Sequence, residues 1–245
     1  MLQFVDRHKY ALTLLYLPVF LTWFFLLEGR PGGGEYVVYS PLDDRIPFRE
    51  EFVFAYFAWF GYLLGFVGWL FTRGNLRTEF PRAAYLLLVG ITACMLVYTF
   101  WPNTQPLRPD PYPRDNALTD VVRGLQGFDT PTNVCPSLHV YTSIVVNHCL
   151  QHSSALTGRR GRAVRLSSWV LLVLISASTV FLKQHSILDL VWAVVLFAAV
   201  WTFGRLGLRW RRGPAASPPP SPPTPPPTRL KVSDTPGNTE RVGDL

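Results

Sequence analysis

The sequence predicts an all-α integral membrane protein, folded as a bundle of six transmembrane helices. Long apolar segments recur along the chain, and several have about the 20 residues that a helix needs to cross a bilayer. Of the 245 residues, 49% are hydrophobic and only 16% are charged, which is more apolar than a typical soluble domain. Short arginine-rich connections separate the apolar segments, as in the cytoplasmic connections of membrane proteins.

Six apolar segments are the expected spans. In order they are 11–27, 52–71, 83–101, 137–150, 166–182 and 188–208. The fourth has only 14 residues and by itself also fits a re-entrant segment, but an even number of spans keeps its basic neighbours on one side of the membrane. We therefore expect an N-terminal arm over 1–10, a catalytic membrane domain over 11–208 and a tail over 209–245.

The tail is basic at its start and then rich in proline, with "GPAASPPPSPPTPPPTRL" beginning at Gly213. Such a run cannot bury a core, so it predicts an extended, polyproline-like segment. A passive solvated tail and a ligand for a proline-binding partner are both compatible with this composition.

The distribution of basic residues predicts the orientation. The connections 72–82 and 151–165 carry three and four arginines, whereas those at 28–51 and 102–136 offset their arginines with carboxylates. The positive-inside rule then places both termini in the cytoplasm and the odd-numbered connections outside the cell membrane. The formal charge of +7 follows the same clusters, so we expect a membrane surface and no nucleic acid as partner. The oligomeric state is open.

Neither the cysteines nor a second histidine pair predicts a metal site or a cofactor. Cys94, Cys135 and Cys149 lack the spacing of metal ligands and of a disulfide framework. His148 and His152 stand four apart, but they follow the fourth span toward its inner end and no third ligand is evident. Interfacial histidines are the favoured interpretation.

Candidate catalytic residues from separated segments share the outer face. His139 starts the fourth span, and His185 and Asp189 start the sixth. His185 and Asp189, four apart, lie on one helix face, so the carboxylate can accept a bond from one imidazole nitrogen and raise the basicity of the other. His185 then suits a nucleophile or base, and His139 can protonate a leaving group. Asp189 also suits a helix N-terminus, where a capping role is the simpler reading.

Two basic residues at the same face suit phosphate oxygens. Arg108, after the third span, offers a planar fork of donors, and Lys183 is a point charge two residues before His185. A non-enzymatic transporter or scaffold could use the same cluster to bind an anion. The joint placement favours a catalytic site.

These residues stand in motifs that resemble a known family. "PLRP" (106–109), "PSLH" (136–139) and "KQHSILD" (183–189) resemble the three signature motifs of the type-2 phosphatidic acid phosphatase superfamily. The residues of the last two motifs, and of "LDDRIPF" (42–48), are similar to those in the branch that contains inositol phosphorylceramide and sphingomyelin synthases and their bacterial relatives.

The resemblance implies a reaction and residue roles. His185 would form a phosphohistidine, Asp189 would orient it, and His139 would serve as acid and then base. Arg108 and the segment beginning at Ser137 would hold the phosphate of a lipid substrate, with no metal. The implied function is a lipid phosphate or pyrophosphate phosphatase, and the alternative is a transferase that moves a phospho-head group between lipids.

The chain departs from the family pattern at three positions. Trp101 stands where the first motif has a lysine, Leu138 replaces the glycine of the second, and Thr179 replaces the arginine of the third. Lys183 is the candidate replacement for a missing cation. These changes are closer to the synthase-like branch, so the acceptor is either water or another alcohol.

Overall fold

The computed structural model of the chain describes residues 2–30, 35–73 and 78–211, with side chains over 15–30, 35–73 and 78–206. The predicted proline-rich tail from Gly213 lies outside the described residues. The long helices, all-α as expected, are α1 (Leu2–Glu28), α2 (Val53–Thr72), α3 (Glu79–Phe100), α5 (Leu138–Gln151), α6 (Gly158–Phe181) and α7 (Ile187–Arg211). Helix α1 runs from Leu2, so residues 2–10 of the expected arm are helical.

Four helices are long and apolar enough to cross a membrane: Glu50–Thr72, Glu79–Phe100, Gly158–Phe181 and Ile187–Leu206. They match the second, third, fifth and sixth expected spans. The apolar part of α1 with described side chains, Leu15–Glu28, is shorter, and α5 has 14 residues, about 21 Å at 1.5 Å per residue. On the basis of these four helices, the chain is a multi-pass membrane protein. The expected bundle of six spans would also need α1 and α5 to cross the membrane, which these four helices do not show.

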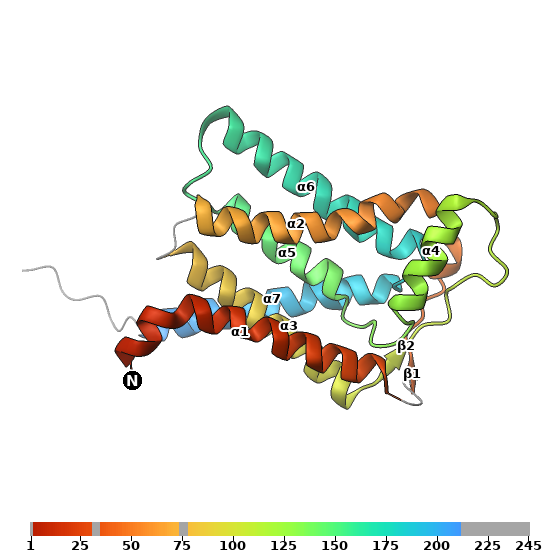
Figure 1. Cartoon of the computed structure of the whole chain (residues 1–245), viewed down its shortest axis with the longest axis horizontal. Coiled ribbons are helices and arrows are strands. Elements are labelled where there is room, and N and C mark those ends of the chain that lie inside the picture. Colours follow the sequence, from red (N-terminus) through yellow and green to blue (C-terminus); the bar gives the residue numbers. More distant parts are fainter. Residues whose placement is uncertain (1, 31–34, 74–77, 212–245) are drawn as a thin grey trace, which may run out of the picture.

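The long helices lie side by side, and their ends collect at two opposite poles (Figure 1). One pole, which we call the loop pole, holds the connection from α1 to α2, the connection from α3 to α5 and the turn from α6 to α7. The N-terminus of α1 and the C-terminal part of α7 lie at the other pole. Predicted site residues on three separate segments therefore arrive at the same end of the bundle.

Helix α5 is the centre of the bundle and packs against α2, α3, α6 and α7. Polar side chains connect it to its neighbours: Trp59 Nε1 donates to Thr142 Oγ1 at 2.9 Å, and Ser168 Oγ donates to Asn147 Oδ1 at 2.8 Å. Such bonds satisfy polar groups that apolar surroundings would otherwise penalise. This central position explains how a short helix with several polar residues is stable among longer, more apolar ones.

The chain enters the bundle before α5 begins. Residues 134–137 are non-helical and buried, and the Asn103 side chain binds them by accepting from Val134 N at 2.9 Å and Cys135 N at 2.8 Å. Irregular backbone is tolerated inside a membrane protein when other protein groups satisfy it in this way. The N-terminus of α5, which carries His139, consequently lies below the loops of its pole.

Small elements that the sequence pattern did not predict cover the loop pole. Strands β1 (Tyr36–Val37) and β2 (Asn103–Thr104) pair in parallel, η1 (Asp43–Arg45) and η2 (Glu50–Phe52) are single 3₁₀ turns, and α4 (Ala117–Phe128) lies across the helix ends (Figure 1). The Asn116 side chain caps α4 by accepting from Leu118 N and Thr119 N, both at 3.0 Å. The apolar face of α4 packs on Phe48 and Leu182, which closes the loop pole over the bundle.

Candidate active site

The His185–Asp189 pair forms as the spacing predicted. His185 Nδ1 lies 3.0 Å from Asp189 Oδ2, and both side chains are buried. The same oxygen accepts from Ser186 N at 2.9 Å, while Ser186 Oγ accepts from Leu188 N at 3.2 Å. This is the reciprocal capping box of a helix start, so Asp189 both caps α7 and binds the imidazole.

The bond to Nδ1 leaves the other nitrogen of His185 for chemistry. A carboxylate that accepts from Nδ1–H selects the tautomer in which Nε2 carries a lone pair. The second carboxylate oxygen, Asp189 Oδ1, has no hydrogen-bond partner among the described residues, and the Cys135 thiol lies close to the Asp189 carboxyl group. Burial, followed by the charge of Asp189, raises the pKa of that thiol, which therefore stays protonated beside the carboxylate.

His139 faces this pair from the first turn of α5. Its ring centroid lies 5.7 Å from that of His185, and the two rings meet edge to face at 64°. Tyr56 and Trp59 of α2 hold the His139 ring, with centroids at 4.6 and 4.5 Å. Over the described ranges neither nitrogen of His139 has a protein hydrogen-bond partner, so both are available for proton transfer.

Ser137 joins the start of α5, which carries His139, to the start of α7, which follows His185. Its hydroxyl caps α5 by accepting from Val140 N at 3.4 Å, and its amide donates to the Asp189 carbonyl at 3.2 Å. The amides that follow Ser137 in the first turn of α5 are the donors that a helix N-terminus leaves for an anion. A phosphate contact at this terminus stays a prediction.

Arg108 reaches the site through a network that fixes its guanidinium. Nη1 donates to Gln126 O at 2.7 Å, Nη2 donates to Gln184 Oε1 at 2.8 Å, and Nη2 also donates to Asp129 O. Nε is buried and has no partner in the described part of the chain. Burial lowers the pKa of Arg108, and the charge of Asp129 opposes this shift. Among the described residues, the Arg108 guanidinium thus keeps one N–H donor, Nε, without a partner, while its Nη2 is bonded to Gln184 beside His185.

Lys183 makes a bond that the sequence did not predict. It adopts a left-handed backbone conformation with φ 57°, and its ammonium donates to the Asp43 carbonyl at 2.6 Å. Partial burial lowers its pKa, and the charges of Asp43 and Asp44 oppose the shift. At Thr179, where the family pattern has arginine, the hydroxyl donates to Ser176 O inside α6 at 2.8 Å. A phosphate contact by the other ammonium hydrogens stays a prediction.

Sequence reasoning missed three polar residues of the network. Asp129 accepts from Tyr56 OH and, at 3.4 Å, from Gln184 Nε2, so it connects the residue beside His185 to the ring that holds His139. Asp43, buried in η1, accepts from Ser186 Oγ at 2.6 Å. The available signal for Gln184 was its place between Lys183 and His185; the other two stand in long connections whose folding has no periodic signature.

The second histidine pair lies at the opposite end of α5. The rings of His148 and His152 are 4.3 Å apart, and His152 Nδ1 lies 2.8 Å from the His148 carbonyl. Across the described residues, no group of three or more His, Cys, Asp or Glu is placed to hold a metal ion.

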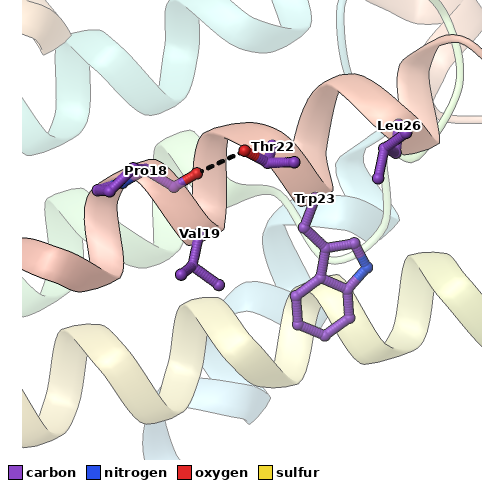
Figure 2. A pocket seen from close by; sticks show the side chains of 5 residues that line it. All are labelled: Pro18, Val19, Thr22, Trp23 and Leu26. Atoms are coloured by element: carbon purple, nitrogen blue, oxygen red, sulfur yellow. Dashed lines mark hydrogen bonds between the residues drawn. The ribbon is translucent and has the colours of Figure 1, made fainter.

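Two surface hollows lie away from the histidines. Figure 2 shows one along α1, lined by Pro18, Val19, Thr22, Trp23 and Leu26. The other, of about 250 Å³, lies between α3 and α7 and is lined by Val97, Trp101, Cys135, Pro136 and Trp192. His139 and His185 line neither hollow.

No protein-family model matches the chain, and comparisons with curated proteins and with solved structures also gave no match.

Proposed function

We propose that the chain is a membrane enzyme that cleaves a phosphate ester of a lipid through a phosphohistidine. The observation that carries the proposal is the buried His185–Asp189 pair, with His139 from another helix facing it at 5.7 Å between ring centroids. A nucleophile oriented by a carboxylate, next to a second histidine with free nitrogens, is an arrangement that suits stepwise group transfer. The proposal includes six spans, cytoplasmic termini and a site that faces outside.

In the first step, Nε2 of His185 attacks phosphorus and the bond from phosphorus to the lipid oxygen breaks. His139 gives its proton to that oxygen, and Asp189 stabilises the positive charge that develops on the His185 ring. In the second step His139 takes a proton from water, whose oxygen attacks phosphorus, and the nitrogen–phosphorus bond breaks. Both histidines return to their starting states, and Arg108 binds phosphate oxygens throughout.

A transferase is the second candidate, and the charge of the site favours it. Trp101 and Thr179 stand where the family pattern has cations, and the carboxylate of Asp129 belongs to the network of Arg108. Loss of a cation removes more stabilisation from a dianionic phosphate monoester than from the monoanion of a phosphodiester. The enzyme would then move a phospho-head group to the hydroxyl of a second lipid or of another alcohol.

One assay separates the candidates. The purified protein in lipid nanodiscs is given phosphatidic acid or a head-group phosphodiester, each labelled at phosphorus, with and without ceramide, diacylglycerol or inositol. Release of inorganic phosphate supports the phosphatase, and a new labelled lipid supports the transferase. No product from any donor contradicts both and leaves an anion-binding transporter or scaffold.

Matched double variants control the assay. His139→Ala with His185→Ala removes the proposed chemistry and lowers turnover by at least about 10³-fold. His148→Ala with His152→Ala makes the same chemical change at the other end of α5 and retains activity within about twofold. Equal losses in both double variants contradict the assignment of the site.

A further inference from the structure

The turn from α6 to α7 carries His185 and has a defined stop signal. Gln184 N donates to Thr179 O at 2.9 Å and Lys183 N donates to Val180 O at 3.1 Å, while Lys183 is left-handed at φ 57°. These two bonds form a Schellman motif, in which glycine is the favoured residue at the left-handed position. The backbone alone therefore gives no reason for a lysine at 183.

The lysine side chain supplies a reason. Its ammonium donates to the carbonyl of Asp43 at 2.6 Å, across 140 residues of sequence. A glycine would relieve the backbone at position 183 but would lose this bond between the turn and the first connection of the loop pole.

Asp43 binds the same turn on the other side of His185. Its Oδ2 accepts from Ser186 Oγ at 2.6 Å and its Oδ1 accepts from Ile187 N at 2.8 Å. Asp43 is 1% exposed. Its Oδ2 also accepts from Ser40 N, in the same connection, at 2.8 Å. A buried carboxylate held by this many donors has a fixed orientation.

Contacts with Asp43 thus flank the candidate nucleophile. Residues 183, 186 and 187 bind Asp43, while His185 and Gln184 bind the carbonyl of Thr179 in α6. Gln105 adds a bond to the Lys183 carbonyl at 2.9 Å. The connection 35–52 therefore holds the backbone on both sides of His185, through residues 183, 186 and 187, and not the His185 side chain itself.

We infer that Asp43 and Lys183 form a clasp that fixes the backbone on both sides of His185, which makes both of them positioning residues for the reaction. The clasp is defined by the three bonds from Lys183 Nζ, Ser186 Oγ and Ile187 N to Asp43. This inference rests on the proposed function, because it assigns His185 as the nucleophile. It gives Lys183 a role in orientation instead of phosphate binding.

The test compares Asp43→Ala and Lys183→Gly with the matched control Asp44→Ala, since Asp44 is an exposed neighbour of like charge. Loss of orientation lowers kcat by about 10- to 100-fold in the clasp variants. The KM and the inhibition constant for orthovanadate, a phosphate analogue, stay within about threefold, because the phosphate contacts are unchanged. Lys183→Arg, which keeps a cation of similar reach, restores most of kcat. Asp44→Ala behaves as the wild type.

Hydrogen exchange of the peptide that covers residues 183–190 gives a readout that does not need turnover. The clasp predicts faster exchange of these amides in Asp43→Ala and Lys183→Gly than in Asp44→Ala. A tenfold rise in the orthovanadate constant of Lys183→Gly at unchanged kcat would make Lys183 a phosphate ligand and overturn the inference. Unchanged exchange in Asp43→Ala also overturns it. Absence of turnover in the wild type with every donor instead contradicts the proposed function, and exchange alone then decides whether the clasp holds the turn.

Discussion

The two histidine pairs at opposite ends of α5 contain the same side chains in different surroundings. At the loop pole, His139 comes from α5 and His185 from the turn before α7, and His185 is bonded to the buried carboxylate of Asp189. At the other pole, His148 and His152 stand on one helix, and His148 packs against the ring of Trp201. Arg205 lies 4.8 Å from the centre of that same Trp201 ring.

The difference shows that spacing alone does not fix the tautomer of a histidine. Both His148–His152 and His185–Asp189 are separated by one helical turn, but only the second pairs an imidazole with an acceptor that fixes its tautomer. His152 instead directs Nδ1 at a backbone carbonyl at the helix end, which is an ordinary terminal contact.

Replacement of Asp189 by asparagine has the largest expected effect. The amide cannot provide the negative charge that selects the Nδ1–H tautomer of His185, so kcat falls by about 10²- to 10⁴-fold. Turnover of the labelled donor in nanodiscs measures the loss, and Asp120→Asn on the exposed side of α4 is the control. A loss below tenfold in Asp189→Asn contradicts the assigned role.

Replacement of Arg108 by lysine has a smaller expected effect and acts on binding. Lysine keeps the charge but cannot reproduce the fork that bonds Gln126, Asp129 and Gln184 at once. We expect KM to rise by about 10- to 100-fold, with a smaller change in kcat. Arg114→Lys, at a half-exposed ion pair with Glu50, is the matched control. A change in kcat alone would place Arg108 outside phosphate binding.

Replacement of Gly90 by alanine tests the packing of α3 against α5, the helix that carries His139 and His148, and its readout is the stability of the protein. An added Cβ would lie 1.8 Å from the hydroxyl oxygen of Tyr141, whose own bond goes to Leu86 O at 2.6 Å. Overpacking between α3 and α5 costs about 1–3 kcal/mol. Gly61→Ala, where nothing lies within 4 Å of the added atom, is the control and should leave stability unchanged or raised. Thermal unfolding in detergent compares the two.

The smallest effect is expected at the inner pair. Single replacements of His148 or His152 by glutamine keep turnover within about twofold, because neither side chain contacts the candidate site. Activity in the presence of a chelator, together with metal analysis of the purified protein, completes this test. A large loss of activity, with bound zinc that disappears in both variants, would show that the inner pair is a functional metal site.

The sequence predicted the long helices well because their signal is local. Expected and observed limits of the second, third and sixth spans agree within a few residues. The larger shifts are at the starts of α1, which begins at Leu2, and of α6, which begins at Gly158 and takes the arginine cluster into the helix. The pairing of His185 with Asp189 was also readable, because one helical turn brings the two together whatever the rest of the fold does.

The structure of the loop pole was harder to predict from the sequence, because it depends on contacts between residues that are far apart in the chain. Asp43 reaches Ser186 across 143 residues, and Tyr56 reaches Asp129 across 73. Neither contact leaves a periodic pattern, and Lys183 resembles any other basic residue near a membrane surface. Polar residues in long connections become part of a site only through tertiary packing, which single-segment reasoning does not reach.

Trapping the proposed phosphohistidine tests the role of His185 at the bond that it would form. The protein in nanodiscs is mixed with a lipid donor labelled at phosphorus, quenched in alkali after milliseconds to seconds, and digested. We predict an acid-labile, alkali-stable label on the peptide that contains His185, and no label on that peptide in His185→Gln. A label on another residue, or turnover that persists in His185→Gln, would contradict the account.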